Sequence, residues 1–289
     1  MGPKPRILIP DLSRKVAIVT GGHTGLGFGT SIELAKAGAR VYIAGRSETK
    51  FDHAKQEILA ECAHADLRFL PVDLADLSSV QRAAQQFTRQ ESRLHLLVNN
   101  AGVNYIGHFL LTKILLPTLQ ETAKTSPEES VRIINVSSDG HAKLAPKKGI
   151  VFPDANMKEG FSVWARYGHS KLANVLHARE MAERYPDILS LSLHPGTVKT
   201  NLSAGPIAST PIYRLLKPLV GLGASGPRKG AANILFAAVS PTLKPDSANG
   251  AYLLPTGKLS APSKAGSDPN MARELWIWTE KELAERGLE

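Results

Sequence analysis

Apolar and polar positions along the chain form blocks that predict strands and helices in regular succession. Short apolar runs bounded by glycine or polar residues are typical of buried strands, and apolar residues recurring every three or four positions indicate helices. We expect strands at 15–20, 41–44, 67–72, 94–99, 131–136 and 188–193. We expect helices at about 50–62, 76–91, 105–122 and 162–184, after a first helix that ends near Gly38.

This alternation of strands and helices indicates an α/β fold. Successive βα units of this length form a parallel sheet with helices on both faces. The sequence shows no repeat, low-complexity tract or linker that would divide it. We therefore expect one domain over residues 1–289, a doubly wound parallel sheet closed by a strand near 250–254.

The final third of the chain has a weaker pattern. Residues 203–225 are rich in Pro, Gly and Ser, yet five apolar residues fall on one helical stripe: Ile212, Leu215, Leu216, Leu219 and Val220. A flexible, half-apolar segment after the last crossover fits a substrate lid over about 200–226. A core helix explains the stripe equally well.

Composition narrows the class of protein. A chain of 289 residues with 43% hydrophobic and 21% charged residues is long enough for a large core. No apolar run reaches the length of a transmembrane segment and no secretory signal opens the chain, so we expect a cytoplasmic protein. The single cysteine, Cys62, fits a reducing compartment and a packing role.

The net charge of +9 is concentrated between residues 188 and 266. Such a surface could attract acidic substrates, cofactor phosphates or an anionic membrane, although a solvated basic face explains it more simply. No nucleic-acid motif accompanies the charge, so we expect no nucleic-acid partner. We also expect no metal site.

A glycine-rich turn follows the first strand. It reads Thr20-Gly-Gly-His-Thr-Gly-Leu-Gly27, with Gly21, Gly25 and Gly27 at the entrance to the first helix. Small residues there let the backbone approach a pyrophosphate at the positive helix N-terminus. A plain βα turn is the alternative, but the position after strand one favours dinucleotide binding, with His23, Thr24 and Leu26 in the same loop.

The end of the second strand indicates which dinucleotide binds. Enzymes that use NAD place an acid there for the ribose 2′-hydroxyl, whereas this chain has Arg46 and Ser47. A guanidinium can hold a phosphate through two hydrogen bonds, so we expect NADP(H). Asp73, followed by Leu74, is expected either at the adenine edge or as a loop cap, and Asp76 is the better helix cap.

Three further residues suggest chemistry. Tyr167 and Lys171 lie four apart on a predicted helix and share a face. A lone Tyr/Lys pair is usually structural. Ser138, however, follows the fifth strand, where this fold presents side chains to the crevice beyond the strand ends.

Several motifs together resemble the short-chain dehydrogenase/reductase family across nearly the whole chain. They are the glycine turn, Asn99-Asn-Ala-Gly102, Ile134-Asn-Val-Ser-Ser138, Tyr167-Gly-His-Ser-Lys171 and His194-Pro-Gly196. The residues around Tyr167 and Pro195 are similar to those of the branch that contains retinol dehydrogenases and fungal enzymes acting on small hydrophobic metabolites. The resemblance implies a Rossmann-type sheet.

The resemblance also implies site roles. The catalytic set is Ser138, Tyr167, Lys171 and Asn104, and further cofactor contacts are Asn100, Ala101, Gly102, Pro195, Gly196, Val198 and Thr200. A free phenol has a pKa near ~10, and Lys171, which also binds the nicotinamide ribose, is expected to lower the pKa of Tyr167. Tyr167 would protonate the substrate oxygen while Ser138 holds it.

One departure from the family concerns the segment after Asn-Asn-Ala-Gly. Val103 alone separates Gly102 from Asn104, where relatives carry a considerable loop and the start of a helix. Asn104 is therefore expected either in its family role or as an N-cap of its own helix. In relatives the missing piece walls the pocket and contributes to a helix–helix homodimer, so an open pocket, a weaker dimer and poor activity are three consequences to consider.

The leading interpretation is an NADP(H)-dependent oxidoreductase that acts on a small hydrophobic alcohol, aldehyde or ketone. An NADP(H)-binding regulator or scaffold with little turnover is the first alternative, because of the shortened segment. A sugar-nucleotide epimerase or dehydratase also uses Tyr and Lys four apart, but the glycine spacing and the lack of a larger C-terminal domain speak against it.

Overall fold

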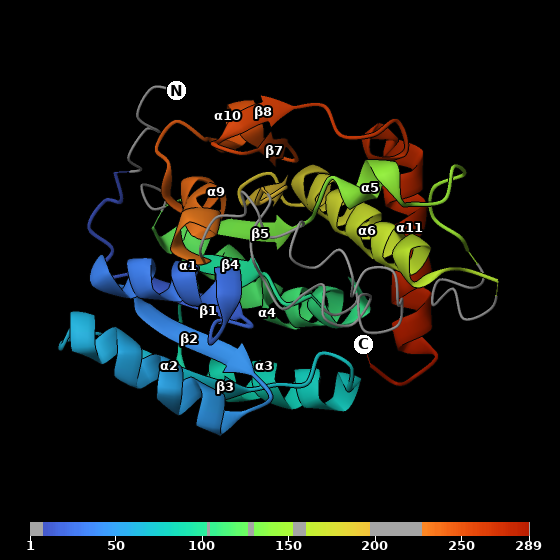
Figure 1. Cartoon of the computed structure of the whole chain (residues 1–289). Helices are drawn as coiled ribbons and strands as arrows, with labels where there is room; N and C mark the ends of the chain where they lie inside the picture. Colours follow the sequence, from blue (N-terminus) through green and yellow to red (C-terminus); the bar gives the residue numbers. More distant parts are fainter. Residues whose placement is uncertain (1–7, 103–104, 127–129, 153–159, 197–226, 289) are drawn as a thin grey trace, which may run out of the picture.

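The computed structural model describes residues 8–102, 105–126, 130–152, 160–196 and 227–288. They form an eight-stranded sheet in the order β3-β2-β1-β4-β5-β6-β7-β8, which runs through the middle of the molecule (Figure 1). The strands are β1 (Val16–Thr20), β2 (Arg40–Gly45), β3 (Leu67–Pro71), β4 (Leu96–Asn99), β5 (Arg132–Val136), β6 (Leu189–Leu193), β7 (Tyr252–Leu254) and β8 (Lys258–Ser260). All neighbours pair in parallel except β7 and β8. The doubly wound parallel sheet is therefore confirmed.

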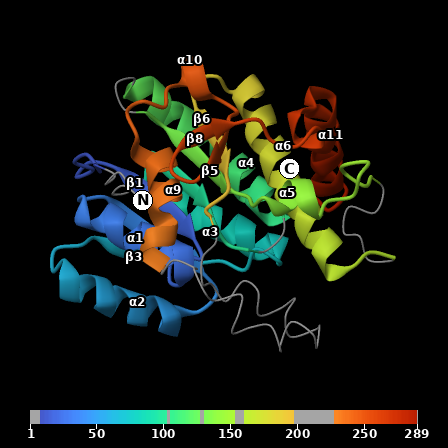
Figure 2. The same cartoon turned by 45° about the horizontal axis from the view of Figure 1, so that its top comes forward.

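Helices cover both faces of the sheet. One layer holds α1 (Gly25–Lys36), α2 (Glu48–Glu61) and α9 (Pro227–Val239). The other holds α3 (Leu77–Gln90), α4 (Tyr105–Thr125) and α6 (Val163–Arg184), with α11 (Pro269–Ala284) packed outside α6. The turned view shows α11 beyond α6 at one end of the molecule (Figure 2). Short helical turns complete the described chain: α5 (Gly140–Lys143), α10 (Pro245–Ala248) and η2 (Ala265–Ser267).

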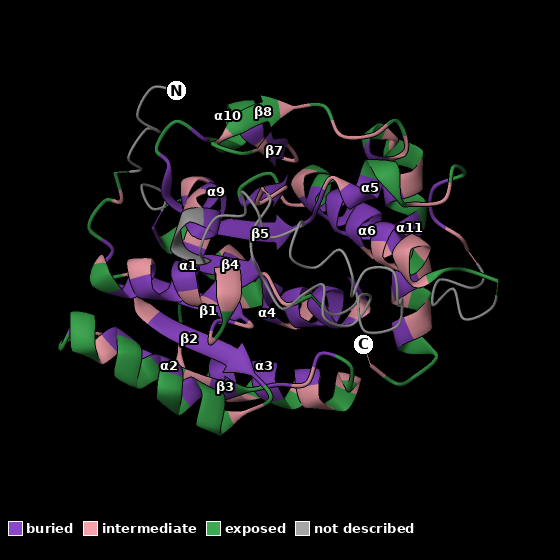
Figure 3. Ribbon diagram, in the orientation of Figure 1, coloured by how far each residue is buried: buried purple, intermediate pink, exposed green. Residues whose placement is uncertain are grey.

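Two apolar cores follow from the alternation of side chains along the strands. In β1, Ile18 faces the core under α3, α4 and α6, whereas Ala17 and Val19 face the core under α1 and α9. Because both faces are covered, β1 is buried along its whole length, and buried residues fill the centre of the ribbon while exposed ones line the outer side of α2 (Figure 3). Burial of both faces explains why the strands are continuous apolar runs in the sequence.

Polar side chains fix the starts of several helices. Ser47, Asp76, Ser162 and Asp268 each accept a hydrogen bond from a backbone N–H in the first turn of α2, α3, α6 and α11 respectively. Such caps satisfy donors that the helix itself leaves unpaired. The expectation that Asp76 is a helix cap is confirmed.

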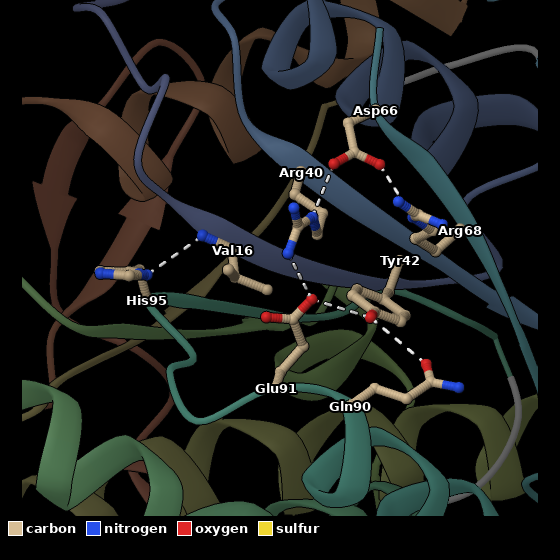
Figure 4. A network of polar contacts seen from close by, with 8 residues as sticks. All are labelled: Val16, Arg40, Tyr42, Asp66, Arg68, Gln90, Glu91 and His95. Carbon is tan, nitrogen blue, oxygen red and sulfur yellow. Dashed lines mark hydrogen bonds and ion pairs between the residues drawn. The ribbon is translucent and has the colours of Figure 1, made fainter.

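An ion-pair network lies at the amino ends of the strands (Figure 4). Arg40 at the start of β2 donates to Asp66 at 2.6 Å and to Glu91 at 2.8 Å, and the hydroxyl of Tyr42 donates to Glu91 at 2.9 Å. Burial and Glu91 raise the pKa of Tyr42 to about 12. These contacts join the end of α3 to β2 and to the start of β3, away from the end where the predicted site residues lie.

A few predicted boundaries differ from the structure. The fourth strand begins at Leu96 rather than residue 94, because the backbone N–H of Leu94 donates to the hydroxyl of Thr122 on α4 instead of to a neighbouring strand. The proposed lid at 200–226 lies outside the described residues. Cys62 and Trp276 are buried and Trp278 packs against the core, which confirms their packing roles. Among the described helices, none has the length and apolar character needed to cross a membrane.

Candidate active site

Three of the four predicted catalytic residues lie close together beyond the carboxyl ends of the parallel strands. Ser138 lies two residues after β5, and Tyr167 and Lys171 lie one turn apart on α6, which packs against β5. Gly140 is in contact with Tyr167: a Cβ at this position would lie 2.9 Å from Cε1 of the tyrosine ring. The segment after β5 is therefore held against the face of α6 that carries Tyr167.

The Ser138 hydroxyl is fixed by local contacts. It donates to Oδ1 of Asp139 at 3.1 Å and accepts the backbone N–H of Gly140, also at 3.1 Å. Asp139 in turn pairs with Lys143, which holds the pKa of its carboxyl below the ordinary value despite partial burial. Ser138 is 9% exposed, so its hydroxyl has one defined environment at the base of the site.

Lys171 is buried, with 4% of its surface exposed. Its Nζ donates to the carbonyl of Val136 at 3.0 Å and lies 5.8 Å from the centre of the Tyr167 ring. Burial lowers the pKa of this ammonium to about 8, so it is still largely protonated at neutral pH. The helix thus places a buried cation behind the phenol.

The pKa of Tyr167 departs from the expectation. Burial raises it, and the negative charge of Asp139 adds to this, while a side-chain hydrogen bond with Ser138 acts in the opposite direction. In the chain alone burial therefore outweighs the hydrogen bond with Ser138. Tyr167 is consequently a protonated phenol, a proton donor rather than a ready base.

The glycine turn between β1 and α1 is built for close approach of backbone. Gly21 has φ of 65°, a left-handed conformation that suits glycine. A Cβ on Gly27 would collide with the carbonyl oxygen of Gly21 and lie 2.7 Å from Nδ2 of Asn100. The first turn of α1 therefore lies directly on the loop, and Thr24, its N-cap, uses no side-chain oxygen to cap the helix. This cradle fits a pyrophosphate at the helix N-terminus.

One hydroxyl joins the three segments around this cradle. Thr20 at the end of β1 accepts the backbone N–H groups of Asn100 and Ala101 at 2.9 and 3.0 Å. Its Oγ1 also lies 2.9 Å from Nε2 of His108 on α4. The same hydroxyl donates to the carbonyl of Val98 at 3.3 Å. Burial lowers the pKa of His108 to about 3, so this imidazole is neutral at neutral pH.

Thr20 and His108 were not among the predicted site residues. Thr20 is the first residue of the glycine motif, so its position in the sequence could have indicated a role in the site. His108 is one of several polar residues in a mostly apolar helix, and its partner on β1 is 88 positions away in the sequence. Only the fold brings the two together.

The expected 2′-phosphate site lies at the end of β2. Arg46 is exposed, and its Nη1 lies 3.9 Å from Oδ2 of Asp73. The ring of His23 packs over Gly45, where a Cβ would lie 2.7 Å from Cε1, and burial with the charges of Lys50 and Arg46 lowers the pKa of His23. Three nitrogen-bearing side chains thus surround this strand end, with Ser47 at the N-cap of α2.

Asp73 has the loop role that was one of its two expected roles. Its carboxylate accepts the backbone N–H of Ala75 at 3.0 Å, and its own N–H donates to Ser79. The next residue, Leu74, is buried under the first turn of α4, where a Cβ on Gly107 would meet its carbonyl. The turn after β3 is thereby fastened to α4.

The turn after β6 completes the described rim. Asn233 of α9 donates to the carbonyl of His194 at 2.7 Å, and Gly196 has φ of 91° with Pro255 close to it. Pro195 and Gly196 thus stand at the carboxyl end of β6, as expected. Asn104, Val198 and Thr200 lie outside the described residues. No group of three metal-binding side chains occurs in the described part of the chain.

Comparison with protein families finds a match over residues 15–149 to the model described as short chain dehydrogenase. The short-chain dehydrogenase/reductase drtF of Aspergillus calidoustus is 41% identical, with 100% of this chain and 99% of the relative covered. An uncharacterized oxidoreductase of Schizosaccharomyces pombe is 39% identical, covering 94% of this chain and 86% of the relative.

Solved structures show the same fold. A protein of Mycobacterium paratuberculosis superposes with a TM-score of 0.71 at 27% identity, covering 94% of each chain. The NADP complex of RhlG from Pseudomonas aeruginosa superposes with a TM-score of 0.64 at 25% identity, covering 86% of this chain and 96% of the other. The drtF alignment runs over 318 positions against the 289 residues here, so about 29 positions have no residue in this chain.

Proposed function

Because the chain belongs to the short-chain dehydrogenase/reductase family, we propose that it is an NADP(H)-dependent oxidoreductase. It transfers hydride between the nicotinamide and a small hydrophobic alcohol or carbonyl compound. The observation that carries the proposal is that α6 holds Tyr167 and the buried Lys171 next to Ser138, at the strand end that the glycine turn also faces. We further propose that it works in the reducing environment of the cytoplasm, which the single cysteine suits.

The cradle residues have the geometry to hold the cofactor, which supplies or accepts the hydride when bound. The absence of a side chain on Gly27 lets α1 lie against the Gly21 carbonyl and Asn100, and we propose that the pyrophosphate binds at this helix end. Lys171 donates one hydrogen bond to Val136, and we propose that another of its ammonium hydrogens binds the ribose. The residues that we propose to hold the cofactor are Gly21, His23, Thr24, Gly25, Leu26, Gly27, Arg46, Ser47, Asp73, Leu74, Asn100, Ala101, Gly102, Tyr167, Lys171, Pro195, Gly196, Val198 and Thr200.

The protonation state of Tyr167 favours carbonyl reduction. Its raised pKa keeps the phenol protonated at neutral pH, so the proton needed by the new alkoxide is in place before reaction. Ser138, whose hydroxyl is fixed by Asp139 and Gly140, would hold the substrate oxygen. The Lys171 ammonium stabilises the phenolate that remains. We also propose Asn104 as a catalytic residue, and only the sequence supports this role.

The expected substrate is apolar around its reacting group. Leu144 is 36% exposed and lies on the same side as the catalytic turn, where a Cβ on Gly140 would be 3.4 Å from its Cδ1. Large apolar side chains that remain exposed beside a reactive group are typical of a site for a hydrophobic ligand.

An assay with purified protein tests this function. NADPH oxidation at 340 nm is followed with a panel of aliphatic and aromatic aldehydes and ketones, and NADP⁺ reduction with the matching alcohols. We expect turnover that is faster in the reducing direction at neutral pH. Binding of NADPH without turnover of any compound would instead support a cofactor-binding regulator, the alternative suggested by the shortened segment.

Arg46→Ala tests the choice of NADP(H) over NAD(H). The guanidinium is proposed to pair with the 2′-phosphate, which NAD lacks, so we expect the Kd for NADPH to rise on the order of 10-fold or more while the Kd for NADH changes little. Fluorescence titration measures both constants. Arg89→Ala, at an exposed position of α3, is the matched control. Equal losses for both cofactors would contradict the assignment of Arg46.

A further inference from the structure

His141 is buried directly behind Ser138. It lies on α5, three residues after the serine, and is 4% exposed. Its Nδ1 is 2.6 Å from the backbone carbonyl oxygen of Ser138, and its Nε2 is 3.0 Å from the backbone nitrogen of Ser263. One imidazole therefore bridges the catalytic turn and a segment more than 120 residues further along the chain.

These two partners determine the tautomer of the ring. A carbonyl oxygen only accepts, so Nδ1 carries the hydrogen, and a backbone N–H only donates, so Nε2 carries a lone pair. A second proton on Nε2 would place two N–H groups against each other at 3.0 Å. The bridge to Ser263 therefore exists only while His141 is neutral.

The Ser263 end of the bridge is itself fixed. Its Oγ accepts the N–H of Gly266 at 3.2 Å and its carbonyl accepts the N–H of Ser267 at 2.9 Å. Gly266 packs on α6, where a Cβ would lie 3.2 Å from Cγ1 of Val175. Residues 263–267, called the C-terminal clasp below, thus give His141 an anchor that does not belong to the catalytic turn.

The surroundings of the His141 ring favour its neutral form. The Tyr252 ring packs edge-on at 4.8 Å between centres. Burial lowers the pKa of His141 by more than the hydrogen bond to the Ser138 carbonyl and the charge of Asp139 raise it. His194 is a further neighbour, and burial lowers its pKa, with Asp139 acting in the opposite direction and Lys143 and His141 lowering it further. At neutral pH the bridge is therefore intact.

We propose that His141 is a positioning residue: as a neutral imidazole it ties the Ser138 carbonyl to the C-terminal clasp and so aligns the serine hydroxyl with the substrate oxygen. This inference rests on the proposed function, in which Ser138 holds that oxygen. Nothing in the sequence distinguished His141 from the eight other histidines, because both of its partners are backbone atoms.

Two substitutions separate the two ends of the bridge. In His141→Asn the amide N–H takes the place of Nδ1 and keeps the bond to Ser138. In His141→Gln the amide oxygen takes the place of Nε2 and keeps the bond to Ser263 while the bond to Ser138 is lost. We expect kcat to fall on the order of 10-fold in both variants, because each breaks one end of the bridge, with the Kd for NADPH unchanged in both.

His53→Asn, at an exposed position of α2, is the matched control and should retain wild-type kcat. A merely structural role would lower the thermal stability of both His141 variants while leaving kcat per folded molecule at the wild-type value. Wild-type kcat per folded molecule in either His141 variant would therefore overturn the proposal.

The pH profile supplies a second readout. In the reducing direction Tyr167 acts as an acid, so its titration causes no loss of kcat at low pH. Burial lowers the pKa of His141 from the ordinary histidine value. Protonation of His141 breaks the bridge to Ser263, so we expect the wild-type kcat to fall at pH values below that ordinary value, and this acid limb to be absent from His141→Asn. The same acid limb in both proteins would assign it to His194 or Asp139 and overturn the role of His141.

Nitrogen chemical shifts test the tautomer without any turnover. Long-range ¹H–¹⁵N correlation spectra of histidine-labelled protein, assigned by comparison with His141→Gln, should show a protonated Nδ1 and an unprotonated Nε2 for His141 at pH 7. A doubly protonated ring or the opposite tautomer would overturn the bridge itself. A wild type with the expected tautomer but no turnover would instead remove the proposed function, so the two failures are distinguishable.

Discussion

Lys171 shows at the scale of one residue how the site costs stability. Its ammonium is buried, and the pKa of about 8 is well below the ordinary 10.5. Below pH 8 the lysine is charged in both the folded and the unfolded chain, and the full cost of burying the charge is present. Between pH 8 and 10.5 only the unfolded chain keeps the proton, so the free energy of unfolding rises with pH.

Lys171→Met should therefore stabilise the protein at neutral pH while abolishing turnover. The shift of the pKa corresponds to about 3 kcal/mol at most, and the Val136 carbonyl keeps a second donor, Nδ2 of Asn174 at 3.1 Å. Urea unfolding at pH 7 and pH 10 measures the effect. The advantage of the variant should shrink at pH 10, whereas the exposed control Lys147→Met should show no such dependence.

The same scale shows what the sequence could and could not predict about the site. Ser138, Tyr167 and Lys171 carry fixed positions relative to a strand end and to one helix face, so spacing and resemblance predict that they meet. Thr20, His108 and His141 act through buried hydrogen bonds to partners fixed by the fold, and no spacing predicts them. The pKa of Tyr167 was expected in the wrong direction because burial was not visible in the sequence.

At the scale of elements, the glycine turn and α1 act as one piece. Gly27 lies where the first turn of α1 contacts both the Gly21 carbonyl and Asn100 of the turn after β4. A side chain there pushes α1 away from the loop and closes the space for the pyrophosphate. The positive helix end and the space in front of it therefore depend on the same residue.

Gly27→Ala should remove stabilisation by the cofactor. For the wild type, NADPH at 100 times its Kd should raise the free energy of unfolding by about 2.7 kcal/mol, whereas the variant should show little or no shift of Tm on addition of NADPH. Glu33→Ala, in the same helix, is the control that tests for a general effect of substitution in α1. A wild-type NADPH shift in Gly27→Ala would show that the cofactor lies elsewhere.

Element boundaries were predicted to within a few residues where apolar runs are long, as in β1, α3 and α6. The one-turn helix α5 and the edge strand β8 were not predicted, because short polar segments carry little periodicity. Both are nevertheless important: α5 carries His141, and the chain beyond β8 carries Ser263. Contacts between segments that are distant in the sequence, rather than a local pattern, determine α5 and β8.

At the scale of the whole molecule, α11 changes the expectation of a homodimer. Trp276 packs edge-on against Phe109 of α4 at 4.7 Å and lies under Arg184 of α6 at 4.7 Å. Thr279 also donates to the hydroxyl of Tyr105 at 3.2 Å. The surface of α4 and α6 available for a helix–helix dimer contact is therefore partly covered by the chain's own last helix.

We expect the protein to be a monomer of 31.1 kDa in solution. A dimer through α4 and α6 would have to displace α11 and expose Trp276, which is 3% exposed here. Size-exclusion chromatography with light scattering, over a range of concentrations and with NADPH, measures the mass. A stable dimer with Trp276 still shielded from quenchers would show that another surface forms the interface.

The most direct test of the whole account is turnover by Tyr167→Phe. The variant keeps the ring that packs against Gly140 and loses only the proton donor, so kcat for reduction with NADPH should fall by about 10²- to 10⁴-fold while the Kd for NADPH stays the same. Tyr185→Phe, at the end of α6, should leave both constants unchanged. Retention of wild-type kcat by Tyr167→Phe would contradict the account.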